Sequence, residues 1–351
     1  MVEEISMKEI ALPFSVAGAE SFNVDLDYVS KLLESNNLGY SGKGIKVAVL
    51  DTGVNSNHPM LVNKVILKQN FTNGDIEDSI VGHGTFVSSE IAGNHILTDG
   101  YVLHGISPDA RIINVKVLDD TGSGQFSVII EGIHWAVTNG ANIINMSLGA
   151  PYDDNGESPL SQTIDWARSK GVITCVASGN SNTTGAPSPN TPGTAKSSIT
   201  VGSINTKGVV SSFSSRGGAS KYPYPTLCAY GGDFPDGEFN TDEGIIGAFK
   251  DGYSSLRGTS MSTPEVAGIC AILMEKLGNA DLVEQSLIKG AIDIDTPGID
   301  NNTGYGKANA KKAIESTVAP IMTKSNIGKF IIYLAIAAGL GWLFYNYRVP
   351  K

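Results

Sequence analysis

The sequence predicts an α/β fold with a mostly parallel central sheet, helices on both faces, and one additional C-terminal transmembrane helix. Short apolar runs alternate with helical patterns along most of the chain, which is typical of a parallel sheet. Apolar residues make up 41% and charged residues 17%, so a folded globular protein is expected rather than a disordered chain. A last apolar stretch is long enough to cross a bilayer.

The predicted strands are apolar on both faces, as expected for strands in the middle of a parallel sheet. They are IKVAVL (45–50), RIINVKV (111–117), NIINMS (142–147) and VITCVAS (172–178). Helical periodicity marks the intervening runs FSVIIEGIHWAV and SPLSQTIDWARS. A Gly- and Pro-rich region from about 221 to 252 is expected to be more loosely structured. Such sheets bind ligands beyond the carboxyl ends of their strands, so functional residues are expected there.

Charge and cysteine content exclude some classes of protein. The net charge of −10 and the lack of a run of Lys and Arg argue against nucleic acid as a partner. Three scattered cysteines are too few for a disulfide framework and are interpreted as buried, reduced side chains. This pattern favours a reducing compartment.

Three motifs carry residues suited to nucleophilic catalysis. Asp51 follows the strand IKVAVL directly, where its carboxylate can hold a histidine ring, although Asp-Thr-Gly also occurs as an ordinary turn. His83 lies between two glycines in GHGTFV, at the start of a helical pattern. Ser260, in GTSMSTPEVAG, precedes a helical run, where it could act as a nucleophile or simply cap the helix.

The three motifs together favour catalysis over these structural alternatives. A serine nucleophile needs a base within hydrogen-bond reach and a third group that fixes the tautomer of that base. It also needs donors for the developing oxyanion. Asn180, in CVASGNSN after another predicted strand, supplies a side-chain amide for this purpose, and the backbone N–H of Ser260 can supply a second donor.

In the order Asp, His, Ser and in the contexts AVLDTGV, GHGTFV and GTSMSTP, the chain resembles the subtilisin-type serine proteases from about Tyr40 to Ser316. The resemblance implies a serine endopeptidase that acts on proteins or peptides and needs no cofactor for catalysis. It implies that Asn180 is the oxyanion-hole side chain. It further implies two substrate-binding segments, an extended strand and the lining of the pocket for the residue before the scissile bond. The extended strand is formed by Ser147, Leu148 and Gly149, and the pocket is lined by Ala177, Ser178 and Gly179.

Several positions depart from the family pattern. Phe86 and Glu265 stand where the family has histidines that are not catalytic. Met60 occupies a position where the family often has a calcium-ligating aspartate, and a thioether is a poor ligand for this hard cation. Asn94 and Asp99, in the longer loop that follows, could still hold an ion. A structural calcium site is therefore doubtful, and the metal ligands stay unassigned.

The first 39 residues are interpreted as an N-terminal extension of a catalytic domain that spans 40–318. They are too few for the folded propeptide of secreted subtilisins, and KEIALPFSVAG resembles the short inhibitory extension of intracellular subtilisins. The resemblance implies that Leu12, Pro13 and Phe14 lie across the cleft and block it. Pro13 would hold a bound strand away from productive geometry. Trimming near residues 14–20, including self-cleavage in trans, would then activate a zymogen; the alternative is a disordered arm.

The C-terminal region is predicted to anchor the chain in a membrane, after a tether at 319–326 and before a short tail at 348–351. Residues 327–347, about 31 Å as a helix, match the hydrocarbon thickness of a bilayer. Lys329 suits one interface and Trp342 the other. A buried C-terminal helix of the globular domain is the alternative. Pairs of small residues spaced by four would permit a helix-mediated dimer. They are Ala335 with Gly339 and Ala337 with Gly341.

Two further questions stay open. The acidic N-terminus favours a catalytic domain in the cytoplasm, but a signal peptide beginning at Met7 would place it outside. The competing function is a catalytically silent, membrane-anchored binding or scaffold protein that kept the fold. The complete set of catalytic residue types argues for the peptidase.

Overall fold

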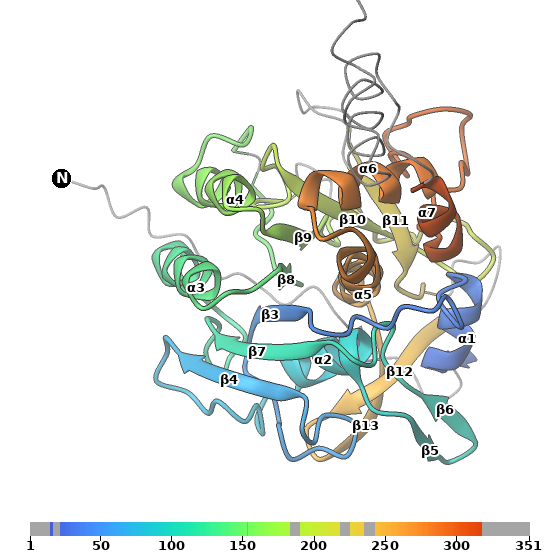
Figure 1. The fold of residues 1–351 in the computed structure, drawn as a ribbon. Helices are drawn as coiled ribbons and strands as arrows, with labels where there is room; N and C mark the ends of the chain where they lie inside the picture. The colour runs from blue at the N-terminus through green and yellow to red at the C-terminus, as the bar shows by residue number, and fades with distance from the viewer. Residues whose placement is uncertain are drawn as a thin grey trace, which may run out of the picture. The chain divides into compact units, whose positions relative to one another are not determined.

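A computed structural model of the chain describes residues 15–16, 22–152, 154–182, 190–217, 225–234 and 243–317. Its central sheet has the strand order β11-β10-β9-β8-β3-β7-β4, and every neighbouring pair is parallel (Figure 1). The strands are β3 (Lys46–Asp51), β4 (Val65–Asn70), β7 (Arg111–Lys116), β8 (Ile143–Met146), β9 (Ile173–Ala177), β10 (Ser198–Ile204) and β11 (Leu227–Tyr230). The four strands predicted from the sequence are confirmed as β3, β7, β8 and β9.

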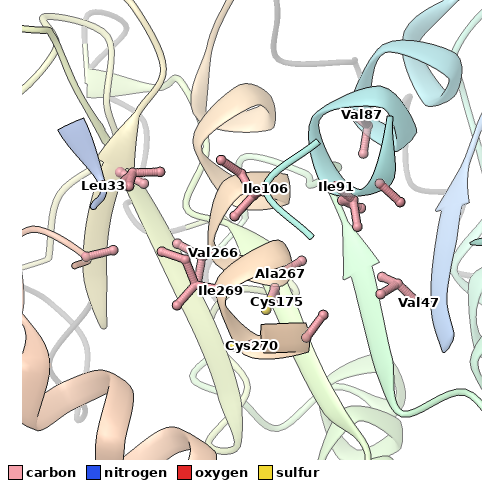
Figure 2. Packing of buried hydrophobic residues seen from close by; sticks show 14 of the residues in the cluster. Leu33, Val47, Val87, Ile91, Ile106, Cys175, Val266, Ala267, Ile269 and Cys270 are labelled. Atoms are coloured by element: carbon pink, nitrogen blue, oxygen red, sulfur yellow. The ribbon is translucent and has the colours of Figure 1, made fainter. Parts of the chain in front are cut away.

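Helices cover both faces of this sheet, as predicted. One face carries α3 (Phe126–Thr138) and α4 (Pro159–Ser169), and the other carries α2 (His83–Ala92) and α5 (Thr259–Leu277) (Figure 1). Successive residues of β3 point to opposite faces, so Val47 belongs to one apolar core and Ala48 to the other. Figure 2 shows side chains of α2, α5 and β3, among them Val87, Ile91 and Val266, packed in the first of these cores.

A second, smaller sheet has the order β1-β13-β12-β2. Its strands are β1 (Ser15–Val16), β2 (Phe22–Val24), β12 (Glu243–Phe249) and β13 (Gly252–Arg257). The strands β11 and β12 lie within the region 221–252, so the expectation of loose structure is wrong there. The sequence pattern missed β11 because its partner β10 lies outside that region, and it missed β12 because glycines interrupt its apolar run.

The remaining elements pack around this frame. They are α1 (Leu26–Leu32), the antiparallel hairpin β5 (Ile96–Thr98) and β6 (Tyr101–Leu103), α6 (Ala280–Gly290) and α7 (Ala310–Ser316). Leu26, Val29 and Leu33 are fully buried in the first core, so this part of the predicted N-terminal extension packs within the same unit as the sheet. The proposed boundary at residue 39 stays a prediction.

The predicted terminal segments lie outside the described residues. This holds for Leu12–Phe14, for the tether at 319–326, for the transmembrane helix at 327–347 and for the tail at 348–351. Among the helices that the structure describes, none combines the length and the apolar character that crossing a bilayer requires.

Candidate active site

Asp51 is the last residue of β3, in the middle of the central sheet. The strand is paired on both sides, by β7 and β8, which fixes the position of its carboxyl end. The Asp51 side chain is buried, and the backbone N–H of Thr52 donates a hydrogen bond to its Oδ1 at 2.7 Å. The carboxylate is therefore held at the sheet edge where ligands of parallel sheets bind.

His83 is the first residue of α2, and its ring meets Asp51 directly. The distance from His83 Nδ1 to Asp51 Oδ1 is 2.8 Å, and both side chains are almost fully buried. Because the carboxylate accepts, Nδ1 carries the proton and Nε2 presents its lone pair. Gly84 permits this close approach, since a Cβ at that position would lie 2.1 Å from the carbonyl oxygen of Gly53.

Ser260 is the second residue of α5, just after Gly258, whose φ of +145° few other residues could adopt. Its hydroxyl donates to the carbonyl oxygen of Ser147 at 3.0 Å, and the Ser147 hydroxyl donates to the carbonyl oxygen of Ser260 at 2.9 Å. These two bonds tie the start of α5 to the chain that leaves β8. To donate to a histidine base instead, the Ser260 hydroxyl must leave the Ser147 carbonyl.

Asn180 follows β9 and is held by the start of α5. Its Oδ1 accepts from the backbone N–H of Thr259 at 3.0 Å and from the Thr259 hydroxyl at 2.9 Å. Both bonds use the carbonyl end of the amide, which turns the Nδ2 donor away from Thr259. The structure thus brings Asn180 beside the residue that precedes Ser260, and its role as an oxyanion donor stays a prediction.

The two predicted substrate-binding segments follow β8 and β9. Ser147 contacts Ser260, and the chain then passes Leu148 and Gly149 to an antiparallel bridge between Ala150 and Thr191. Ala177 ends β9, and the Ser178 N–H donates to the carbonyl oxygen of Val201. Gly179 has a φ of +103°, and a Cβ there would lie 2.4 Å from the Asn190 amide. Residues 183–189, next along the chain, lie outside the described residues.

Two polar residues at this site were missed by the sequence reasoning. Lys116 ends β7, is fully buried, donates to the Thr52 carbonyl oxygen at 2.5 Å and pairs with Asp120 at 2.9 Å. Asp78 is also buried and contacts Thr52 as well as the first turn of α2. A signal existed in each case. Lys116 is a charged residue within a predicted apolar strand, and Asp78 lies five residues before His83.

The structure shows where the residues considered for a calcium ion lie. Met60 is fully buried in the apolar core, so its side chain is no surface ligand. The Asn94 amide nitrogen donates to the carbonyl oxygens of Pro59 and Val62, and Asp99 occupies the turn of the β5–β6 hairpin with a φ of +46°. Within the described ranges, no three His, Cys, Asp or Glu side chains gather as metal ligands would.

Comparison with known proteins agrees with this geometry. Residues 42–306 match the profile of the subtilase family. The chain is 34% identical over 287 residues to subtilisin amylosacchariticus of Bacillus subtilis subsp. amylosacchariticus, covering 78% of this chain and 69% of the relative. It is 33% identical over 278 residues to thermitase of Thermoactinomyces vulgaris, covering 78% and 90%. Subtilisin DY of Bacillus licheniformis matches at 33% over 273 residues, covering 77% and 89%.

Proposed function

Because the chain belongs to the subtilase family and is a serine endopeptidase, we propose that it cleaves peptide bonds through an acyl-enzyme on Ser260. The single observation that carries this assignment is the buried 2.8 Å contact between His83 and Asp51, at the sheet edge where α5 begins. The pair supplies an oriented base, and the helix start supplies a serine.

The proposed reaction has two halves. Ser260 Oγ bonds to the carbonyl carbon of the scissile peptide while His83 Nε2 takes the hydroxyl proton. Asp51 stabilises the imidazolium, and Asn180 Nδ2 with the backbone N–H of Ser260 holds the oxyanion. The C–N bond then breaks as His83 returns the proton to the leaving amine. Water attacks the acyl-enzyme with His83 again as base, which releases the acid product and restores Ser260.

Labelling with a fluorophosphonate separates the peptidase from the competing scaffold function. A chain that begins at Gly18, and so lacks the proposed inhibitory residues, is expected to label, and its Ser260→Ala variant is expected not to label while it retains the fold by circular dichroism. If the Gly18 chain also stays unlabelled, the silent scaffold is favoured. We also propose a preference for small or apolar residues before the scissile bond, because Ser181 and Asn182 beside this pocket carry no charge. Cleavage of a peptide library measures it.

The described part of the N-terminal segment supports the proposal that this segment inhibits the enzyme. Strand β1 pairs antiparallel with β13, with Ser15 opposite Arg257 and Val16 opposite Leu256. Arg257, the partner of Ser15 in this pair, is three residues before Ser260. A strand added to a sheet edge is also how many peptides are bound. We therefore propose that Leu12, Pro13 and Phe14 obstruct the cleft.

Two variants test this inhibition. A chain that begins at Gly18 is expected to show a higher kcat/KM than the full chain, because it lacks β1 and the blocking residues. Full-length Ser260→Ala, mixed with the active protein, is expected to be cut near residues 14–20 if self-cleavage in trans activates the zymogen. Equal activity of the Gly18 chain and the full chain would contradict inhibition. Lack of cutting would contradict only self-processing.

We also propose that residues 327–347 anchor the enzyme in a membrane as a single-pass helix, with the catalytic domain in the cytoplasm. The support is their apolar sequence with aromatic residues at one end. The full chain should resist carbonate extraction from membranes, and a chain without residues 319–351 should not. Protease protection in sealed vesicles then distinguishes the cytoplasmic arrangement from the extracytoplasmic one. A dimer through the small-residue pairs stays a prediction, testable by cross-linking.

A requirement for calcium at the Met60 loop is not part of the proposal. The burial of Met60 in the core is the observation that argues against it. Calorimetric titration of the protein with calcium is expected to show no binding tighter than micromolar. Sub-micromolar binding that Asp99→Asn removes would overturn this view.

A further inference from the structure

A buried carboxylate outside the expected catalytic set joins the two halves of the His83–Asp51 pair. Asp78 lies in the loop between β4 and α2 and is 2% exposed. We propose that Asp78 is a positioning residue, which holds the first turn of α2 against the end of β3 and so fixes His83 on Asp51. This inference rests on the proposed roles of His83 and Asp51.

On one side, Asp78 binds the start of α2. Its Oδ2 accepts from the backbone N–H and from the hydroxyl of Thr85, each at 2.9 Å, and its Oδ1 accepts from the N–H of Gly82 at 2.9 Å. Gly82 is the N-cap residue and has no side chain with which to cap the helix. Asp78 therefore caps the N-terminus of α2 from a neighbouring loop, and it fixes the backbone on both sides of His83.

On the other side, Asp78 binds the residue that follows Asp51. The Thr52 hydroxyl donates to Asp78 Oδ1 at 2.7 Å, and the same oxygen of Thr52 accepts from the N–H of Gly84 at 3.1 Å. Thr52 in turn donates its backbone N–H to Asp51 at 2.7 Å. One carboxylate thus connects the strand that carries the acid with the helix that carries the base.

The charge of Asp78 matters because four donors converge on it. Burial, with a smaller contribution from the Asp51 charge, raises the pKa of Asp78 to about 6 in spite of these hydrogen bonds. The other charged groups around it are His83 on α2, Lys116 on β7, and Asp75 and Glu77 in its own loop. Asp78 is therefore ionised at neutral pH, and its protonation below about pH 6 would convert one acceptor oxygen into a donor that faces donors.

The consequence is that a second protonation, that of Asp78, also lowers the activity at acid pH. The acid limb is the part of the pH profile in which activity falls as the pH is lowered. Protonation of the base His83 alone gives a limb in which log kcat/KM falls by one for each pH unit. If Asp78 must also stay ionised, log kcat/KM of the wild-type enzyme falls by more than one for each pH unit below about pH 6. A purely structural side chain would lower stability without changing this slope.

Asp78→Asn is the direct test, because it keeps the size of the side chain and removes its charge. At pH 8 it is expected to lower kcat/KM by about 10- to 100-fold, mainly through kcat, since small displacements of a catalytic group cost rates on that scale. The acid limb should fall to a slope of one. Glu77→Gln is the matched control, because this neighbouring carboxylate binds Ser56 and Lys68 and not α2. It should keep the rate and the steep limb.

A second pair of variants decides the question if Asp78→Asn fails to fold. Thr52→Val removes the hydroxyl that joins Asp78 to the end of β3, and it should lower kcat; Thr52→Ser keeps that hydroxyl and should restore the rate. The inference is overturned if Asp78→Asn or Thr52→Val has wild-type kcat, or if the loss leaves the slope unchanged and follows a fall in Tm. In those cases the chain that begins at Gly18 still labels with fluorophosphonate, whereas failure of the proposed function abolishes labelling of that chain.

Discussion

The two helices that carry His83 and Ser260 bury carboxyl groups in two very different settings. At the start of α2, Asp78 accepts four hydrogen bonds, and its pKa is raised only to about 6. Deeper between α2 and α5, burial raises the pKa of Glu90 and of Glu265 far above the ordinary value. Neither oxygen of Glu90 has a hydrogen-bond partner among the described residues, and Glu265 accepts from Tyr230 N–H alone.

The contrast teaches that burial alone does not decide the charge of an acid. Donors from the backbone and from hydroxyl groups stabilise the ionised form of Asp78, whereas an apolar setting disfavours ionised Glu90 and Glu265. The charge of Glu265 raises the pKa of Glu90 further. The start of α2 is therefore expected to control the rate of the reaction, and the interior between the two helices is expected to control stability and its dependence on pH.

The largest expected effect comes from Ser260→Ala, which removes the proposed nucleophile. kcat should fall about a million-fold, a scale carried over from subtilisin, while the free energy of unfolding changes little. Steady-state kinetics and urea denaturation measure the two quantities separately. A large loss of stability would show that Ser260 also holds the fold, and the division between the two regions would then break down.

The next effect is that of Asn180→Ala at the proposed oxyanion donor. kcat is expected to fall by about 10²- to 10³-fold with a nearly unchanged KM, because the Nδ2 group acts only on charge that develops in the transition state. Peptide hydrolysis at saturating substrate measures this. A rise in KM without a fall in kcat would instead assign Asn180 to binding of the ground state.

Gly84→Ala tests how closely α2 must approach β3. The added Cβ would lie 2.1 Å from the Gly53 carbonyl oxygen and 3.0 Å from the Asp51 Cβ, so the helix must move away. We expect a loss of about 1–3 kcal/mol in the free energy of unfolding together with a lower kcat. Gly252→Ala is the control, because its Cβ would meet open space. Unchanged kcat in Gly84→Ala would show that the His83–Asp51 contact tolerates displacement.

Glu90→Gln is expected to have the smallest effect on the rate of the reaction, and it concerns stability and its dependence on pH. The pKa of Glu90 in the folded protein is raised well above its ordinary value of 4.5, so the folded state binds this proton more tightly than the unfolded state. The free energy of unfolding therefore falls as the pH rises above about 4.5, by about 1.4 kcal/mol for each pH unit, until the folded pKa is reached. Glu90→Gln should remove that slope and raise Tm at pH 8.

Denaturation at pH 5, 6, 7 and 8 measures this slope, in a Ser260→Ala background that prevents self-digestion. Glu131→Gln, on the exposed side of α3, is the matched control and should leave the slope unchanged. An identical pH dependence in Glu90→Gln and in the parent would contradict a neutral Glu90 in the folded protein.

Much of the fold could be predicted because its signals are local. The apolar runs of β3, β7, β8 and β9 are buried on both faces, so each shows its burial without knowledge of its partner. β12 could not be recognised in this way. Its Gly-containing sequence becomes a strand because β13 and β2 pair with it.

The sequence by itself determined which residues we propose as catalytic. Asp51, His83 and Ser260 each lie at a particular local backbone feature, a strand end or a helix start next to glycine. Neighbouring residues in the sequence indicate these features. Only the tertiary structure decided what supports them. Asp78, Lys116 and the Ser147–Ser260 pair act across chain separations of 26 to 113 residues, and Met60 lies in the core instead of at an ion. The physical reason is that hydrogen bonds and apolar burial depend on which atoms meet in space, and a single sequence does not contain that information.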